Sequence, residues 1–385
     1  MTPEKATQVV LLTPQGRGAV ATVLIEGPRA AELVAELFHP ATGRSILDQP
    51  CGKILFGRWF SPEYGEELVV CRRDSQRIEI HCHGGQAAPR AIVASLIERG
   101  CSALEWNDWI RKTTVDPIAA TAQIALAAAA TERAAAILCD QLAGALRQAI
   151  NQLSILIRDG NVPAASAKID HLLDFSDLGL HLKQPWQICF AGRTNVGKSS
   201  LINALLGYER AIVHATAGTT RDVVTAGAAI DGWPVELADT AGQRASSDEL
   251  ETEGIGLGQR QLAKADLVVL VFDLSVAWSD EDDALATAWP GALHVFNKRD
   301  LTNSVAFDNS VHLTTSALAA EGLGDLERAI SKRLVPRVPA AGQAIPFTIR
   351  QVETLHEIRR DLQSGEAAAA SKLLERPTSW ADADC

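Results

Sequence analysis

Eight residues near the middle of the chain restrict its fold more than any other feature. Residues 192–199 read Gly-Arg-Thr-Asn-Val-Gly-Lys-Ser and match the pattern GxxxxGK[ST] without a mismatch. An apolar run typical of a strand, Trp186–Phe190, precedes them, and a run typical of a helix, Ser200–Leu206, follows. A glycine-rich loop in this position turns backbone amides and a helix N-terminus toward phosphate. The pattern therefore predicts a phosphate-binding loop in an α/β sheet.

The residues around this loop alternate between strand and helix patterns. The dipeptide Asp231-Gly232 is typical of a hairpin turn between two strands. This alternation predicts a mostly parallel sheet with helices on both faces, spanning residues 186–336. The expected strands after the first are Val235–Ala238, Leu267–Phe272, Ala292–Phe296 and Val311–Thr314.

Helical patterns flank this α/β domain on both sides. Residues 115–182 look helical throughout, because they are rich in alanine and carry apolar residues three and four apart. Helical spacing returns at Ile349–Leu362 and Ala367–Leu374. We expect a P-loop α/β domain inserted into an α-helical domain that is formed by residues 113–185 and 337–385.

The first part of the chain, residues 1–112, has the pattern of a small α+β domain. Short runs rich in β-branched or aromatic residues suit strands, and two stretches have helical spacing. The expected strands are Gln8–Leu12, Val20–Ile25, Lys53–Phe60, Glu66–Arg73 and Arg77–Cys82, and the expected helices are Pro28–Phe38 and Gln86–Arg99.

Composition and charge exclude several classes of protein. No apolar run reaches the 18 residues of a membrane-spanning helix, and residues 1–8 are too polar for a secretory signal. The net charge of −11 gives no support for a nucleic-acid partner such as tRNA. Seven scattered cysteines without a CxxC pair indicate reduced thiols, so we expect a cytoplasmic location.

Two further motifs suit a triphosphate with Mg²⁺. Asp239-Thr-Ala-Gly242 follows an expected strand, so Asp239 could hold Mg²⁺ through water and the Gly242 amide could contact the γ-phosphate. Thr219 and Thr220 lie between this motif and the phosphate loop. A threonine there can complete the Mg²⁺ shell while the triphosphate is bound and release it afterwards.

The base is predicted to be guanine. Asp300, in Asn297-Lys-Arg-Asp300, can accept hydrogen bonds from the N1–H and the exocyclic amine of guanine, a donor pair that adenine lacks. The stem of Lys298 would pack along the base, and an amide of Thr315-Ser316-Ala317 would donate to O6. The residues expected to contact GTP or GDP are Asn195, Val196, Gly197, Lys198, Ser199, Ser200, His214, Ala215, Thr216, Ala217, Gly218, Thr219, Thr220, Asp239, Thr240, Ala241, Gly242, Asn297, Lys298, Asp300, Ser316 and Ala317.

These motifs, in this order, resemble the GTPase domain of the MnmE (TrmE) family of tRNA modification GTPases. The segment Ala217–Asp222 matches the Gly-Thr-Thr-Arg-Asp motif of that family. Near the start, Thr13–Val20 looks like the opening of the family, and Ile80–Gly85 looks like its His-Gly-Gly segment. The resemblance covers most of the chain and implies GTP hydrolysis, a homodimer, and a flavoprotein partner in the modification of wobble uridines in tRNA.

The resemblance also implies two cations at the site. Ser199 and Thr220 would be ligands of Mg²⁺. The family uses K⁺ as a catalytic cation, which an asparagine of the phosphate loop and backbone carbonyls of the following loop bind. In this chain the K⁺ ligands would be Asn195, His214, Thr216 and Thr219.

Two residues compete for the role of positioning the attacking water. The glutamate of the second switch in the family aligns with Glu251, in an acidic stretch that could equally be a solvated helix start. Gln243 directly follows Asp-Thr-Ala-Gly, where Ras-like proteins carry the glutamine that orients water. We therefore expect Glu251, Gln243 or both to be catalytic.

Other positions depart from the family and leave a second hypothesis open. The family binds a folate one-carbon donor in its N-terminal domain, but Leu24 replaces an arginine of that domain and Ser75 lies where an acid is expected. Residues 104–112 differ from the family's sequence, and Cys385 lacks the Cys-x-Gly-Lys context. These departures put folate binding and the tRNA chemistry in doubt. The alternative is a regulatory or assembly GTPase that binds a protein or ribosomal RNA.

Overall fold

The computed structural model describes residues 6–13, 18–60, 65–208, 225–239, 262–301 and 313–381. The chain divides into two compact units, Met1–Val115 and Asp116–Cys385. The first unit ends at Val115, where the sequence predicted a boundary at residue 112. The expected helical and α/β domains fall together in the second unit, where they share one hydrophobic core.

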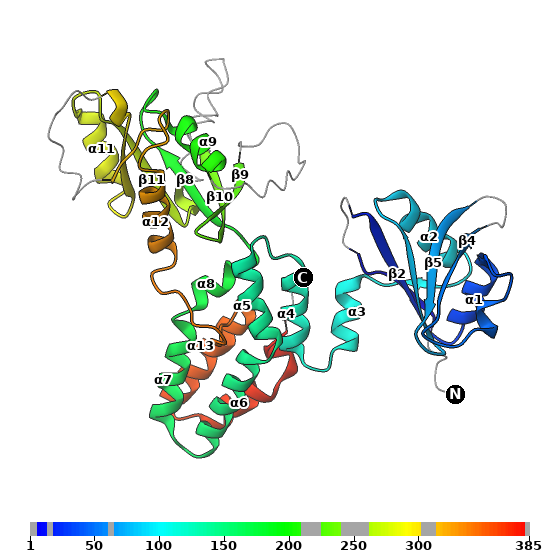
Figure 1. Ribbon diagram of the computed structural model, residues 1–385. Helices are drawn as coiled ribbons and strands as arrows, with labels where there is room; N and C mark the ends of the chain where they lie inside the picture. The colour runs from blue at the N-terminus through cyan, green and yellow to red at the C-terminus, as the bar shows by residue number, and fades with distance from the viewer. Residues whose placement is uncertain are drawn as a thin grey trace, which may run out of the picture. The chain divides into compact units, whose positions relative to one another are not determined.

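The N-terminal unit is built on a seven-stranded sheet in the order β3-β4-β5-β6-β2-β1-β7 (Figure 1). All neighbouring strands are antiparallel except β1 and β7, which are parallel. Helices α1 and α2 contribute to one hydrophobic core with the sheet. The elements are β1 (Gln8–Leu11), β2 (Val20–Glu26), α1 (Ala30–Leu37), β3 (Phe38–Pro40), η1 (Ile46–Asp48), β4 (Ile54–Trp59), β5 (Glu66–Arg72), β6 (Arg77–His83), α2 (Ala87–Ile97), β7 (Ser102–Ala103) and α3 (Trp106–Thr113).

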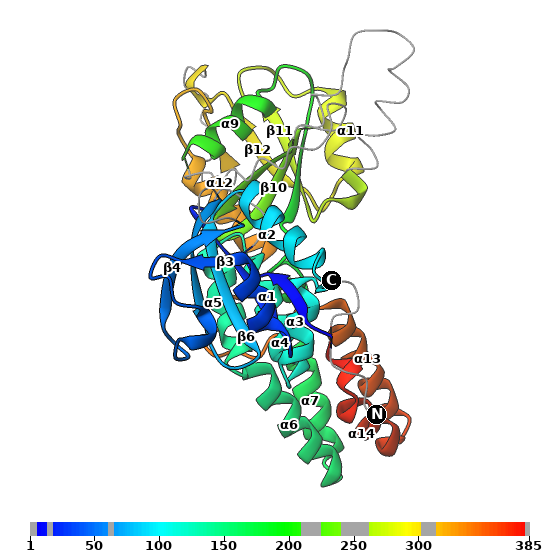
Figure 2. The ribbon, with the colours of Figure 1, turned by 90° about the vertical axis from the view of Figure 1, so that its right-hand side faces the viewer.

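The helical part of the second unit is made from two stretches of sequence. Helix α13 packs on α7 and α14 packs on α6, so segments about 200 residues apart run side by side (Figures 1 and 2). No helix within the described ranges is long and apolar enough to span a membrane. The elements are α4 (Pro117–Ala127), α5 (Glu132–Leu142), α6 (Ala145–Arg158), α7 (Val162–Leu173), α8 (Ser176–Leu180), α13 (Ile349–Gln363), α14 (Ala367–Glu375) and η3 (Pro377–Ser379).

One detail of the helical expectation was wrong. Residues 115–182 are not helical throughout, because α4 ends at Ala127 and α5 begins at Glu132. The Thr131 hydroxyl accepts a hydrogen bond from the Ala134 amide and so caps the new helix. Gly144, at φ 104°, separates α5 from α6. Alanine content conceals both breaks, whereas the capping threonine and the glycine mark them.

The α/β part contains a six-stranded sheet in the order β13-β12-β11-β8-β10-β9. All pairs are parallel except the hairpin of β9 and β10, which turns at Asp231-Gly232 as the sequence predicted. The elements are β8 (Trp186–Ala191), α9 (Lys198–Tyr208), β9 (Thr225–Ile230), β10 (Trp233–Asp239), β11 (Leu267–Asp273), α11 (Asp280–Ala288), β12 (Leu293–Asn297), η2 (Arg299–Leu301), β13 (Leu313–Thr314) and α12 (Leu323–Leu334).

Strand order determines where this sheet can bind a ligand. The chain builds outward from β8 in one direction through β10 and in the other through β11, β12 and β13. Ligands of such sheets bind beyond the carboxyl ends of the strands at the point where the order reverses. The residues that follow β8, β10, β11 and β12 therefore meet at one end of the sheet.

Candidate functional site

The phosphate loop connects the end of β8 to the start of α9, and two of its positions require glycine. Gly192 has φ 149°, and a Cβ there would lie 2.3 Å from the carbonyl oxygen of Val271 on β11. Gly197 has φ 95°, and a Cβ there would lie 2.3 Å from Nδ2 of Asn297. A side chain at either position would force the neighbouring strand away. The loop is thus packed directly on the sheet.

Lys198 and Ser199 stand at the N-terminus of α9, where the sequence predicted phosphate and Mg²⁺ binding. The Lys198 ammonium is 4% exposed and donates to the carbonyl oxygens of Gly192, at 3.0 Å, and Arg193, at 2.8 Å. The Ser199 hydroxyl donates to the carboxylate of Asp239 at the end of β10. A hydroxyl and a carboxylate side by side fit the oxygen ligands that Mg²⁺ prefers, directly or through water.

Asn297 was expected to contact the nucleotide, but its amide is engaged by protein groups. It is 2% exposed, and its Nδ2 donates to the carbonyl oxygen of Val196 at 3.0 Å. Its Oδ1 accepts from the Thr315 hydroxyl at 3.2 Å and from the Ala317 amide at 3.1 Å. Asn297 therefore ties the phosphate loop to both segments that were predicted to read the base.

The predicted base-reading carboxylate has a fixed orientation. The hydroxyl of Ser316 donates to Oδ1 of Asp300 at 2.5 Å. Ser316 also forms a bridge with Glu321, in which each backbone amide donates to the other's carbonyl oxygen. The loop after β13 is therefore held beside the loop after β12, as recognition of one ring by both segments requires.

The structure adds Asp273, at the end of β11, to the predicted base site. Its carboxylate pairs with the Lys298 ammonium at 2.6 Å, and Lys298 has φ 66°. Burial acts to raise the pKa of Asp273, but hydrogen bonds from Lys298 and Ser275 outweigh it and hold that pKa below its usual value. An acid that ends a buried strand was the signal available in the sequence.

Arg193 anchors the phosphate loop to another helix. Its guanidinium pairs with Glu281 at 2.9 Å and with Asp282 at 3.4 Å, and it donates to the Ser279 hydroxyl at 3.0 Å. Ser279 and Asp282 form the capping box that begins α11. The motif pattern leaves this position unspecified, so sequence reasoning missed its role.

Asn195, the expected K⁺ ligand of the phosphate loop, has φ 62° and an exposed side chain. Within the described ranges its amide has no hydrogen-bond partner, so its oxygen is available to a ligand. The other residues expected in the switch regions lie outside the described residues; they are His214, Ala215, Thr216, Ala217, Gly218, Thr219, Thr220, Thr240, Ala241, Gly242, Gln243 and Glu251.

Two buried thiols are not nucleophiles. Burial, aided by the charge of Asp239, raises the pKa of Cys189 to about 11. Burial, aided by Glu66, raises the pKa of Cys82 to about 11. Both thiols therefore stay neutral near pH 7, where only a thiolate is a strong nucleophile or metal ligand.

The histidines on either side of Cys82 are engaged by neighbouring strands. His81 Nδ1 lies 3.1 Å from the Thr22 hydroxyl, and His83 Nδ1 lies 2.5 Å from the carboxylate of Glu66. Among the described residues, no three His, Cys, Asp or Glu side chains gather as a metal site would require.

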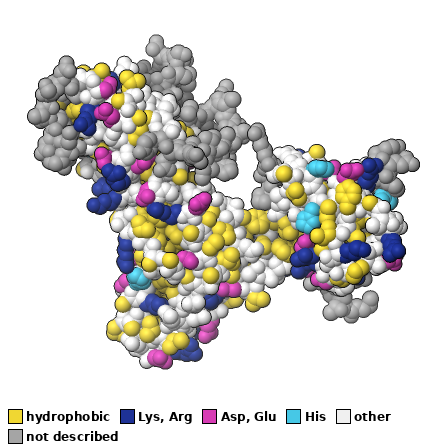
Figure 3. All heavy atoms as spheres, in the orientation of Figure 1, with side chains coloured by type: hydrophobic (Ala, Val, Ile, Leu, Met, Phe, Trp, Pro, Cys, Tyr) yellow, Lys and Arg dark blue, Asp and Glu magenta, His cyan; other side chains and the backbone are white. Residues whose placement is uncertain are grey.

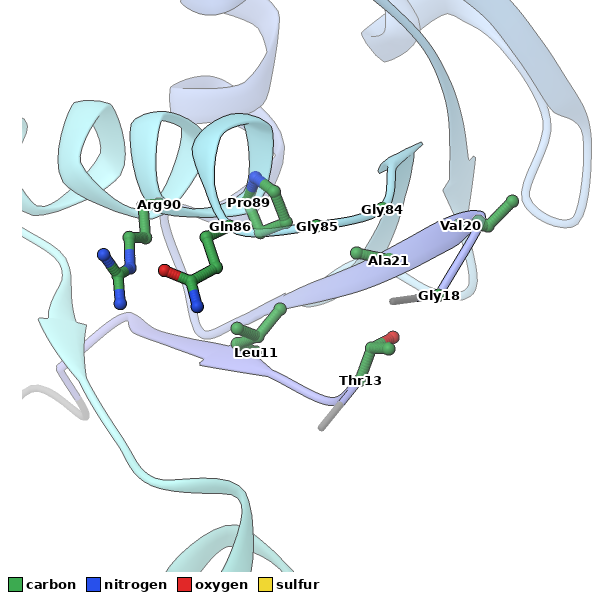
Figure 4. A pocket seen from close by; sticks show the side chains of 10 residues that line it. All are labelled: Leu11, Thr13, Gly18, Val20, Ala21, Gly84, Gly85, Gln86, Pro89 and Arg90. Atoms are coloured by element: carbon green, nitrogen blue, oxygen red, sulfur yellow. The ribbon is translucent and has the colours of Figure 1, made fainter. Parts of the chain in front are cut away.

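The N-terminal unit contains a pocket between β1, β2 and the start of α2 (Figure 4). Gln86, which precedes α2, and Arg90 of α2 reach into it, and none of the described residues that line it carries a carboxylate. Leu24, which stands where the family carries an arginine, is 1% exposed within the sheet and does not line the pocket.

Comparisons with known proteins show that this chain is similar to GTPases. Residues 187–298 match the family described as 50S ribosome-binding GTPase. The tRNA modification GTPase MnmE of Geobacillus thermodenitrificans is 30% identical over 374 residues, which span 84% of this chain and 81% of that protein. MnmE of Lactococcus lactis subsp. cremoris is 30% identical over 416 residues, which span 97% of this chain and 91% of that protein. Among solved structures, the G domain of the T. maritima FeoB iron transporter is 24% identical, with a TM-score of 0.30, and covers 39% of this chain and 99% of that one.

Proposed function

Because the chain belongs to the MnmE family of tRNA modification GTPases, we propose that it couples GTP hydrolysis to the modification of wobble uridines in tRNA. The observation that supports the coupling is the extent of the similarity, which covers 97% of this chain in one relative and so includes its N-terminal and helical parts. A GTPase domain alone would match only residues near 186–336. That the chain is a GTP hydrolase follows from the family itself.

Each described residue of the site has a role in hydrolysis of GTP to GDP and phosphate. The Lys198 ammonium leaves its carbonyl partners to bind the β- and γ-phosphates, where it offsets negative charge in the transition state. Ser199 would ligate Mg²⁺, and Asp239 would hold the ion through water. The ion, when bound, neutralises charge that develops on the transferred phosphoryl group. Asp300 selects guanine.

Complementation tests the coupling to tRNA. We expect this chain, expressed in cells that lack MnmE, to restore the carboxymethylaminomethyl-type uridine of tRNA, as measured by mass spectrometry of digested tRNA. Restoration should disappear with Lys198→Ala, because that variant lacks the charge that binds the phosphates. Lys332→Ala removes an exposed lysine of α12 and should restore the nucleoside like the parent chain.

Failure of complementation would favour the alternative hypothesis. If the chain hydrolyses GTP but restores no modified uridine, it is a regulatory or assembly GTPase that has lost the modifying site. The departures at Leu24 and residues 104–112 are the features that would explain such a loss. Figure 3 bears on the same question, since Lys and Arg side chains on the face shown are interspersed with Asp and Glu rather than gathered in a stripe.

We further propose that K⁺ assists hydrolysis. The exposed amide of Asn195, which has no hydrogen-bond partner among the described residues, supports this role, and the remaining expected ligands are His214, Thr216 and Thr219. A monovalent cation beside the phosphates would replace the arginine that other GTPases use to offset transition-state charge.

The salt dependence of turnover tests this role. We expect GTP turnover, measured as phosphate release, to be about tenfold or more faster in KCl than in NaCl at equal ionic strength. Asn195→Gly removes the amide and tolerates the positive φ, so this variant should turn over equally in the two salts. Equal rates of the parent chain in KCl and NaCl would eliminate the role of K⁺.

Two residues remain candidates for positioning the attacking water, Glu251 and Gln243. We propose that Glu251 does so, with Gln243 sharing the task. Single-turnover hydrolysis should slow by about a hundredfold or more with Glu251→Ala and by less with Gln243→Leu. The substitution that leaves the rate intact identifies the residue that does not act on the water.

The partners of the family complete the proposal. We propose a homodimer, a flavoprotein partner and a cytoplasmic location for the protein.

A further inference from the structure

The hairpin of β9 and β10 reaches from the nucleotide site to the helical part of the protein. Its turn, at Asp231-Gly232, lies at the end of the sheet opposite the phosphate loop. Both turn residues have positive φ, 51° and 75°. Six paired positions join the two strands along their length, so the hairpin spans about 20 Å.

Arg133, from α5 of the helical part, contacts the turn of this hairpin. Its Nη1 donates to Oδ2 of Asp231 at 3.1 Å, and its guanidinium lies 4.9 Å from the centre of the Trp233 ring. Its side chain also passes along Gly232, where a Cβ would lie 3.4 Å away. Asp231 accepts a second hydrogen bond from the Ser331 hydroxyl at 2.8 Å. Charge, ring stacking and packing thus meet at one side chain.

The other end of the hairpin carries the groups that respond to GTP. Strand β10 ends at Asp239, whose carboxylate accepts from the Ser199 hydroxyl. Strand β9 begins at Thr225, a few residues after the predicted switch threonines. Binding of Mg²⁺ with GTP would replace the hydrogen bond between Ser199 and Asp239, so we expect the end of the hairpin to shift relative to α9.

The turn of the hairpin is followed by a buried indole N–H that has no hydrogen-bond partner among the described residues. Trp233 is 1% exposed, and its indole N–H has no hydrogen-bond partner in the described part of the chain. A buried donor without a partner destabilises the arrangement that contains it. The buried N–H of Trp233 therefore does not stabilise the present position of the turn.

We propose that Arg133 couples the helical part to the nucleotide site and that it acts through the β9–β10 hairpin. Arg133 stabilises the position of the hairpin in which Asp239 accepts a hydrogen bond from Ser199. GTP binding therefore has to overcome the contacts between Arg133 and the turn. Coupling of this kind is reciprocal, so a partner that moves the helical part changes the affinity for GTP by the same factor by which GTP changes the affinity for that partner.

Global stability should hardly depend on this contact. The side chains of Arg133 and Asp231 are 37% and 50% exposed, and ion pairs this exposed contribute little to folding. A change in nucleotide preference on removing Arg133 would therefore report coupling rather than loss of the fold.

The test compares affinities of the full chain for GDP and for a non-hydrolysable GTP analogue, each with Mg²⁺. We expect Arg133→Ala to raise the preference for the GTP analogue over GDP by about two- to tenfold. Asp231→Asn, which keeps a residue type that tolerates positive φ, should shift the preference in the same direction. The double variant should shift the preference by less than the sum of the two single effects, because both substitutions weaken the same ion pair between Arg133 and Asp231.

A matched control is Arg337→Ala. Arg337 also stands beside an acid, Asp174, at 3.6 Å and over a ring, that of Phe175, at 5.0 Å, but it does not touch the hairpin. Arg337→Ala should leave the preference for the GTP analogue over GDP unchanged. Arg133→Lys, which keeps the positive charge, should shift that preference less than Arg133→Ala does. An unchanged or lowered preference in Arg133→Ala, or an equal shift in Arg337→Ala, overturns the proposal. All these variants should still bind GTP, so this failure differs from failure of the GTP site.

Discussion

Asp300→Asn should change the preferred base from guanine to xanthine. A carboxylate accepts from both the N1–H and the exocyclic amine of guanine, whereas an amide turns one donor toward that amine. Loss of two charge-assisted hydrogen bonds should weaken GTP binding by about a hundredfold or more. Xanthine carries an oxygen in place of the amine, so the new amide can donate to it. Fluorescence titration with GTP and XTP measures both affinities.

The geometry supports a clean interpretation of this substitution. Asparagine keeps the shape of Asp300 and can still accept from the Ser316 hydroxyl, so the fold of the loop should persist. Asp325→Asn, at an exposed acid of α12, provides the same change of charge away from the base and should bind GTP normally. If Asp300→Asn retained the affinity of the parent chain for GTP, the residue that reads the base would have to be another.

Lys198→Ala should abolish most of the hydrolysis. Its ammonium is buried in the loop, where no other described cation replaces it, and the phosphates would lose their point charge. We expect kcat to fall by about a thousandfold at saturating Mg²⁺, if GTP binds at all. Phosphate release under single-turnover conditions measures the effect.

The fold of that variant needs its own check, because the carbonyl oxygens of Gly192 and Arg193 lose a donor. Ser199→Ala gives a second test of the site, in which Asp239 loses the hydroxyl that donates to it. That variant should need a higher Mg²⁺ concentration for half-maximal hydrolysis. A Lys198→Ala protein that melts like the parent chain and still hydrolyses GTP at the parent rate would contradict the assigned role.

The sequence predicted the sheets better than it predicted the helix boundaries. Strands β2, β5 and β6 begin where the predicted strands begin, because burial of one face gives their residues an alternating pattern. Strand β8 also begins as predicted, but it is recognised as a short apolar run because both of its faces are buried. Two short edge strands, β3 and β7, were missed. They contain too few residues for a period to show, and they pair only because their neighbours are already in place.

The candidate site divides in the same way. Lys198, Ser199, Asp239 and Asp300 could be placed from motifs, since their roles depend on local chain geometry at a strand end. The role of Asn297 could not, because its amide bonds to a carbonyl 101 residues earlier in the chain. The anchor of Arg193 on α11 spans 86 to 89 residues and depends on folding of the whole sheet. Contacts at such separations leave no pattern in a single sequence.

The buried amide of Asn297 has a consequence for how the enzyme resets after each turnover. By joining the phosphate loop to both base-reading segments, Asn297 fixes these parts of the nucleotide site relative to one another through protein contacts alone. A site that is already ordered before the nucleotide binds loses little conformational entropy on each binding event. This part of the site therefore needs no rebuilding between turnovers, and each new GTP should meet a site that is already formed.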